Sequence, residues 1–278
     1  MEKDALARAV EDFAARLWDT PDGDMKRPWA WREYDEGVRV AYLRTVEELR
    51  ELAVRLAARI PRSEAQHILA QYHASYRDLQ AVLLGVDDEL AAAVPADGEW
   101  PLRRVLDHII QADRNFFTIQ VVTLQRFRSG EPPVKLNEEI WQAFWAGESQ
   151  PREGPFSELM AYYKSLHRRI LAELAGTAAG ELEAASLYWE SKPMPVRFRL
   201  HRFESHVRQH TVQAEKTLDL LGRRPNEARY LLRQIYAALA EVEGWRIGAP
   251  AAGAAEREAL AAEIGKRIQE VVSVLDGP

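Results

Sequence analysis

The feature that most constrains the fold is a regular repeat of apolar residues in the first third of the chain. After Ser63, apolar side chains recur at alternating intervals of three and four residues. The members of this face are Leu69, Tyr72, Tyr76, Leu79, Leu83, Val86 and Leu90. This spacing places them along one side of an α-helix, and a helix with one apolar side needs neighbouring helices to bury it. The pattern is typical of a helix bundle.

Further helical runs fill most of the remaining sequence, whereas alternating β-branched stretches are nearly absent. We predict these helices over residues 3–17, 38–60, 101–128, 140–145, 156–174, a run ending at 221, 227–245 and 256–275. Three residues mark helix ends, because Ser63 suits an N-cap, Pro101 a first helical turn and Gly222 a left-handed C-cap. The segment 20–37, which is interrupted by prolines and glycine, is predicted to be a break.

The simplest architecture is all-α, with a central bundle of four long helices over residues 63–222. A helical extension, residues 1–62, precedes the bundle, and a second extension, residues 223–278, follows it. Each extension has an apolar face that needs a partner, so we expect the two extensions to pack on each other.

Composition narrows the class of protein. The 278 residues carry a net charge of −6, and nucleic-acid-binding proteins usually show a basic surplus, so we expect no nucleic-acid partner. The chain has no cysteine, which excludes disulfides, thiolate metal ligands and a cysteine nucleophile within it. Its charged, amphipathic start lacks the apolar core of a secretion signal, and no apolar run is long enough to span a membrane. We therefore expect a soluble, cytoplasmic protein.

The most informative motif for function is His206-x-x-x-His210, within the last helix of the predicted bundle. Residues four apart on an α-helix project from the same side, about one turn apart. Two imidazoles so placed can bind one metal ion, and spacing alone fits two half-buried structural histidines equally well. Both residues lie beside the apolar face of the helix, where an interior histidine needs a hydrogen-bond partner or a metal.

A third histidine, His108, lies in the predicted helix over 101–128, beside Val105 and Ala112. By itself this residue is better explained as a core histidine with a hydrogen-bond partner. Three neutral imidazoles converging from two helices would leave coordination positions open, as a catalytic metal site does.

Several other catalytic patterns are missing from the sequence. Val207 follows His206, so the helix lacks the glutamate base of the His-Glu-x-x-His metalloproteases. The single Glu-x-x-His pair, Glu64 with His67, falls short of the two that a di-iron bundle needs. A phosphate-binding glycine-rich loop and a Gly-x-Ser-x-Gly elbow are also missing, which leaves P-loop and ordinary serine-hydrolase chemistry unsupported.

Four further residues are candidates to contact a substrate or to support the metal ligands, namely Arg104, Asp113, Arg208 and His73. His73 flanks the apolar face of its helix, and its simpler explanation is a boundary histidine near the mouth of the bundle. Asp113 is expected to be a helix-surface carboxylate, so we do not assign it as a base. His167 and His201 are expected on helix surfaces or in loops. No catalytic residue is assigned.

The order of these motifs resembles the DinB/YfiT-like superfamily, whose relatives include bacillithiol S-transferases and mycothiol-dependent maleylpyruvate isomerases. The resemblance covers about residues 63–222 and is carried by the segments GEWPLRRVLDHIIQADR and SHVRQHTVQAEKTLDLLG. It implies a four-helix bundle with a divalent ion, zinc or nickel, held at one end by three histidines. The implied ligands are His108, His206 and His210. The resemblance also implies a homodimer.

The resemblance also implies a metal-dependent enzyme that acts on a small molecule. The metal would activate a low-molecular-weight thiol cosubstrate or water, for an S-transferase or hydrolase-like reaction. The alternative is a non-catalytic stress-response or interaction protein whose metal site is structural or vestigial. The two helical extensions depart from the compact form of the family and leave the substrate open.

Overall fold

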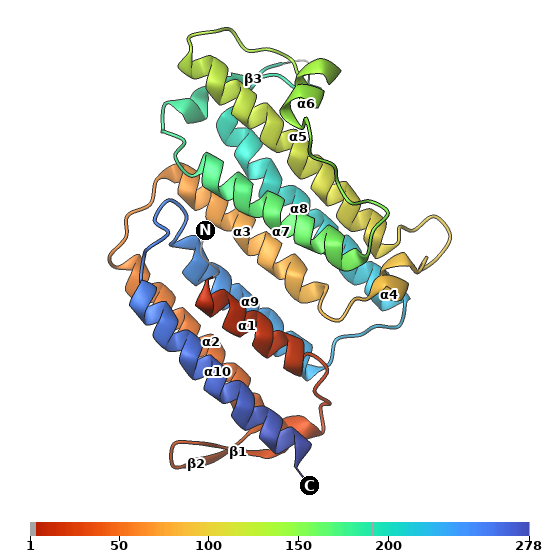
Figure 1. The fold of residues 1–278 in the computed structure, drawn as a ribbon, viewed down its shortest axis with the longest axis vertical. Helices are drawn as coiled ribbons and strands as arrows, with labels where there is room; N and C mark the ends of the chain where they lie inside the picture. The colour runs from red at the N-terminus through yellow and green to blue at the C-terminus, as the bar shows by residue number, and fades with distance from the viewer. Residues whose placement is uncertain (1–3, 191, 278) are drawn as a thin grey trace. The chain divides into compact units, whose positions relative to one another are not determined.

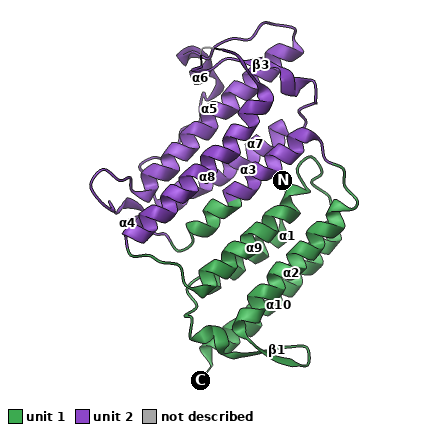
Figure 2. Cartoon of the chain, turned by 180° about the vertical axis from the view of Figure 1, so that it is seen from behind, with its two compact units in different colours: residues 1–61, 77–85, 222–278 green, residues 62–76, 86–221 purple. Residues whose placement is uncertain are grey.

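The computed structural model describes residues 4–190 and 192–277, and most of them are helical (Figure 1). This part of the chain contains ten α-helices, two 3₁₀ helices and two pairs of short strands, so the predicted all-α class is confirmed. Contacts divide the chain into two compact units, which are coloured separately in Figure 2. No helix among the described residues is long and apolar enough to cross a membrane.

The unit that carries the histidine motif comprises residues 62–76 and 86–221, in purple in Figure 2. Its helices are the first part of α3 (Glu64–Val82), α4 (Asp88–Ala92), α5 (Leu102–Arg128), α6 (Glu138–Phe144), α7 (Phe156–Leu174) and α8 (Val196–Leu220). The connection between α7 and α8 contains the 3₁₀ helix η2 (Glu181–Glu183) and strands β3 (Ala185–Ser186) and β4 (Met194–Pro195), which pair antiparallel. The long helices α3, α5, α7 and α8 form the predicted four-helix bundle.

Helix ends in this unit follow local side-chain chemistry. Ser63 caps α3 as predicted, since its backbone N–H donates to Gln66 Oε1 at 2.9 Å and Gln66 N–H donates to Ser63 Oγ at 3.3 Å. Pro101 is the N-cap of α5, directly before the first helical residue. Gly222, just past α8, has φ +74°, the left-handed conformation that was predicted for it.

Helix α3 is shorter than the apolar repeat predicts. It ends at Val82, and Val86 and Leu90 are therefore only partly buried. The chain turns at Gly85, whose φ of +71° ends the helical path. Asp87 then starts α4, because its carboxylate accepts the Leu90 N–H at 2.8 Å. The apolar spacing continues in the sequence across this turn, so the spacing alone does not show where α3 ends.

The second unit comprises residues 1–61, 77–85 and 222–278, in green in Figure 2. Its helices are α1 (Ala5–Leu17), α2 (Val38–Ala57), the end of α3, α9 (Glu227–Gly244) and α10 (Ala254–Asp276). Helix α1 packs on α10 and α2 packs on α9, so the N-terminal and C-terminal segments share one apolar core. The predicted first helix began at Lys3, which lies outside the described residues. The boundaries at 62 and 222 between bundle and extensions stay a prediction.

A small hairpin follows the 3₁₀ helix η1 (Asp24–Lys26), within the segment that was predicted to be only a break. Strand β1 (Pro28–Trp31) pairs antiparallel with β2 (Tyr34–Gly37). Tryptophan and tyrosine stabilise the hairpin, since the rings of Trp31 and Tyr34 stack at 6.4 Å. The sequence did not predict this hairpin, because prolines and glycine are typical of turns and breaks as well as of the ends of short strands.

A buried arginine ties three helices of the second unit together. The side chain of Arg77, from the end of α3, is 4% exposed. Its guanidinium donates to Glu243 of α9 at 2.6 and 2.7 Å and to Glu11 of α1 at 3.0 Å. Because a buried charge is costly unless it is paired, this bidentate arrangement fixes the register of the three helices.

Gly85→Ala should destabilise the second unit through a steric contact as well as through its backbone conformation. A Cβ atom at this position would lie 2.7 Å from the Trp18 ring, at φ +71°. We expect a loss of about 2–4 kcal/mol in the free energy of unfolding, measured by urea titration. Gly222→Ala is the control, because its φ is +74° and no atom lies within 4 Å of the added Cβ. Equal losses in the two variants would show that the Trp18 contact has no effect.

Candidate metal centre

Helices α5 and α8 pack against each other in opposite directions. Near the start of α5, Trp100 O accepts a hydrogen bond from Thr217 Oγ1 at 3.3 Å, close to the end of α8. Further along α5, the ring of Phe116 meets that of Phe203 edge to face at 5.7 Å. This antiparallel register brings His108 level with the histidine pair in the middle of α8.

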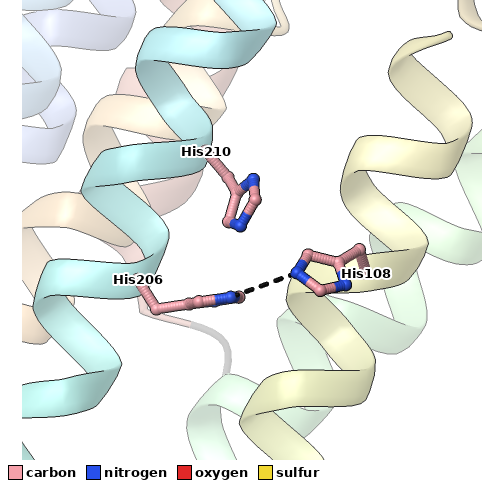
Figure 3. Close-up of side chains that lie close together, drawn as sticks. All are labelled: His108, His206 and His210. Carbon is pink, nitrogen blue, oxygen red and sulfur yellow. Dashed lines mark hydrogen bonds between the residues drawn. The ribbon is translucent and has the colours of Figure 1, made fainter. Parts of the chain in front are cut away.

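The three histidines converge on one point between these helices. Figure 3 shows the imidazoles of His108, His206 and His210 pointing toward one another. One nitrogen from each ring lies within 4.8 Å of the nitrogens of the other two. Nε2 of His206 and Nε2 of His108 are 3.3 Å apart, and the ring centroids are separated by 4.4–5.1 Å. The structure thus brings together the three residues that the resemblance implied.

The environment keeps two of these imidazoles neutral. Burial, reinforced by the nearby His210 and His108, lowers the pKa of His206 to about 3. Burial also lowers the pKa of His108, with His210 acting in the same direction and Asp107 opposing it. Near pH 7 each of these rings therefore keeps a lone pair on one nitrogen, which is the state that binds a metal.

A glutamine orients the third imidazole. Nδ1 of His210 lies 2.7 Å from Gln213 Oε1, and a carbonyl oxygen can only accept, so Nδ1 carries the hydrogen. The lone pair of His210 is then on Nε2. Outer hydrogen bonds of this kind fix the tautomer of metal-binding histidines. Nδ1 of His206 is buried and has no hydrogen-bond partner among the described residues.

The donor set fits a divalent transition-metal ion. Imidazole nitrogens bind zinc at about 2.0–2.1 Å, so two tetrahedral ligands lie about 3.3 Å apart. The Nε2 atoms of His108 and His206 show that separation, 3.3 Å. Two lone pairs at this distance repel unless a proton or a cation lies between them. Three nitrogen ligands also leave coordination positions for a small molecule, and imidazole serves zinc, nickel, copper and iron alike.

Two aromatic side chains hold the rings in place. The Trp100 ring meets His108 edge to face at 5.4 Å, and Phe116 meets His206 edge to face at 5.7 Å. The sequence motifs linked neither of these aromatic residues to the histidines, and they did not single out Gln213. Helical spacing could have identified Gln213, because it follows His210 by three residues and so lies on the same side of α8.

The four additional candidates have different surroundings. Arg104 lies one turn before His108, and its guanidinium carbon is 4.3 Å from the centroid of the Trp100 ring. Arg208 is exposed and donates to Glu204 at 2.5 Å along the same helix. His73 is buried, and its Nδ1 lies 2.9 Å from Nε2 of His167, so it pairs there and is not part of the three-histidine cluster.

Asp113 is a buried residue, so the expected helix-surface position was wrong. Its side chain is fully buried, and Oδ2 accepts hydrogen bonds from Tyr72 at 2.6 Å and Tyr163 at 3.1 Å. Burial raises the pKa of Asp113 to about 7, although the two phenols act in the opposite direction. The helical position explains this, because Asp113 lies four residues from both Ile109 and Phe117, which are buried.

His167 is also buried, contrary to the expectation of a surface residue. It is 1% exposed and stacks on Tyr76 with the ring centroids 3.8 Å apart. His201 is exposed on α8, as expected. The interior of the bundle therefore contains a second polar group, formed by the Asp113 carboxyl, two phenols and the His73–His167 pair.

These features define a helical bundle with a cluster of three inward-facing histidines. A sequence model of the DinB superfamily matches residues 71–214, which is more than half of the chain and includes all three histidines. The protein therefore belongs to the DinB superfamily. Comparisons with curated proteins and with solved structures gave no match.

The buried carboxyl of Asp113 predicts a pH dependence of stability. Folding raises its pKa from 3.8 to about 7, so between these values the folded state holds a proton that the unfolded chain has released. The free energy of unfolding should thus fall as pH rises through this range. We expect Asp113 to contribute about 2–3 kcal/mol of the loss between pH 5 and pH 8.

Urea unfolding at pH 5 and pH 8 measures this contribution. Asp113→Asn should reduce the difference between the two pH values by that amount, whereas Asp97→Asn, at an exposed position, should leave it unchanged. An unaltered difference in Asp113→Asn would contradict the buried, protonated carboxyl.

Proposed function

We propose that this protein is a divalent-metal-dependent enzyme in which His108, His206 and His210 hold the ion. The observation that carries the proposal is the convergence of three imidazoles from two helices, two of them buried and that of His108 partly buried, with one nitrogen of each within 4.8 Å of the others. A set of three protein ligands is typical of catalytic rather than structural zinc sites, because structural sites use four.

The chain's own residues prepare the site before any ion arrives. Burial keeps His108 and His206 neutral, and Gln213 fixes the proton of His210 on Nδ1. Trp100 and Phe116 limit rotation of two of the rings. Such preorganisation reduces the ordering that ligand binding would otherwise require.

The proposed reaction uses a small-molecule nucleophile. A bound zinc or nickel ion supplies a Lewis acid that lowers the pKa of a thiol or water at an open position. The chain contains no cysteine, so a thiol nucleophile must come from a low-molecular-weight cosubstrate. The reaction is then an S-transfer to an electrophile or, with water, a hydrolysis.

Metal content of purified variants tests the ligand set. We expect the wild type to retain about one zinc or nickel ion per chain after dialysis, because three imidazoles share the coordination. His206→Ala and His210→Ala should each lose it, as measured by mass spectrometry of the metals. His201→Ala is the matched control, since it removes an exposed histidine from the same helix. Equal metal content in all four proteins would contradict the proposal.

Thiol consumption separates catalysis from structural metal binding. The metal-loaded wild type should accelerate the reaction of a low-molecular-weight thiol with a chlorodinitrobenzene acceptor, or the hydrolysis of an activated ester. Metal removal and His206→Ala should both abolish the acceleration, while circular dichroism confirms that the variant is folded. Metal binding without either activity would favour the non-catalytic alternative.

A further inference from the structure

Arg114 is a buried cation on a side of α5 that is turned away from the histidine cluster. It follows His108 by six residues, so the two side chains project about 120° apart around the helix. The residue is 5% exposed. Burial lowers the pKa of its guanidinium, yet this group stays protonated at neutral pH. The bundle therefore contains a positive charge that water can barely reach.

Two tryptophans cover this guanidinium. Its carbon lies 4.1 Å from the centroid of the Trp145 ring and 5.1 Å from that of Trp141. Both indoles are held in place by hydrogen bonds to α5, because Trp145 Nε1 donates to Thr118 Oγ1 and Trp141 Nε1 donates to Asn115 Oδ1, each at 2.9 Å. Stacking of this kind covers the faces of a guanidinium and leaves its N–H groups, which lie in the plane, free to donate.

The guanidinium of Arg114 has no hydrogen bond or ion pair within the part of the chain that the structure describes, and its Nε is buried. An exposed arginine would donate to water instead, whereas a residue that is 5% exposed cannot hydrate all of its N–H groups. Glu148, the carboxylate that acts on this cation, already accepts from Tyr162 at 2.9 Å and from Arg169 at 3.1 Å. A buried charge is costly unless it is paired, so this site lacks one negative charge.

The other cations near this site have acidic partners. Arg169 pairs with Glu173 at 2.8 Å as well as with Glu148, and Arg152 pairs with Asp107 at 3.3 Å. One uncompensated cation matches a singly charged anion, whereas a doubly charged phosphate would bring an unpaired negative charge. The planar edge of a guanidinium also fits a carboxylate, which accepts two parallel hydrogen bonds from it.

We propose that Arg114 anchors a second binding site, which takes a small monocarboxylate at the edge of the guanidinium beneath α6. The ligand accepts hydrogen bonds from Arg114, and Trp141 and Trp145 shield the pair from water. Because the same guanidinium stacks on both tryptophans, the bound anion also holds α6 against α5. The site is separate from the metal centre, since Arg114 supplies no atom to the histidine cluster.

A titration followed by tryptophan fluorescence and by calorimetry tests this site. The probes are acetate, propionate and benzoate, the neutral amide of each acid, and inorganic phosphate. We expect one carboxylate to bind and to change the fluorescence, because two indoles contact the guanidinium. Its amide and phosphate should bind at least tenfold more weakly. A result in which no carboxylate binds more tightly than its amide, or in which phosphate binds best, would overturn the proposal.

Variants on α5 locate the bound carboxylate. Arg114→Met keeps the length of the side chain and should weaken binding about tenfold or more, since hydrogen bonds to a charged group are lost. Arg114→Lys keeps the charge but not the planar pair of donors, and should also bind more weakly. Arg128→Met is the control, because Arg128 is an exposed arginine of the same helix that pairs with Glu181 at 2.6 Å. Equal affinity in all these proteins would contradict the assignment to Arg114.

Loss of the metal ligands distinguishes this site from the proposed metal centre. His206→Ala, and the wild type after treatment with a chelator, should bind the carboxylate with unchanged affinity. If either change abolishes binding, the anion lies on the metal and the inference is overturned. If the wild type holds metal but binds no carboxylate, the inference fails and the proposed function stands.

Discussion

The packing of α5 against α8 is the contact on which the candidate site depends. Because the helices are antiparallel, a histidine in the first half of α5 meets a histidine pair in the middle of α8. The nitrogens converge to within 4.8 Å only in this register. A shift of either helix by one turn would move its histidines by about 5.4 Å and would separate them. The aromatic contacts of Trp100 and Phe116 with the imidazoles help to fix that register.

The bundle interior carries two polar groups with different chemistry. The histidine cluster has lone pairs that converge on one point, which suits a cation. In the second group, Oδ2 of Asp113 accepts two phenol hydrogen bonds, while Oδ1 is buried without a partner among the described residues. Burial raises the pKa of this carboxyl to about 7. Phe203 packs against Tyr72 at 4.9 Å and against Phe116 at 5.7 Å, so apolar rings lie between the two groups. This separation allows one group to bind a ligand while the other serves the core.

Much of the fold was predictable from local rules. Helix α7 has the predicted bounds, the Ser63 cap and the left-handed Gly222 are as predicted, and the three histidines lie together. The early end of α3 was not predictable from apolar spacing, since the repeat continues past Gly85. Asp113 and His167 were expected on the surface because they are polar residue types. Their positions on the same helix faces as buried residues would have predicted their burial. Pairings such as Arg77 with Glu243 join residues far apart in sequence, which spacing cannot reveal.

The central claim is that three histidines hold a metal ion with an open coordination position. Measuring the coordination of the bound metal tests it most directly. X-ray absorption spectroscopy of the zinc- or nickel-loaded protein reports the number and type of ligands. We expect three imidazole nitrogens at about 2.0–2.1 Å, together with a light ligand that is replaced by sulfur, at about 2.3 Å for zinc, when a small thiol is added. A shell of four protein ligands that does not change with thiol would contradict an open catalytic centre, as would a spectrum without imidazole scattering.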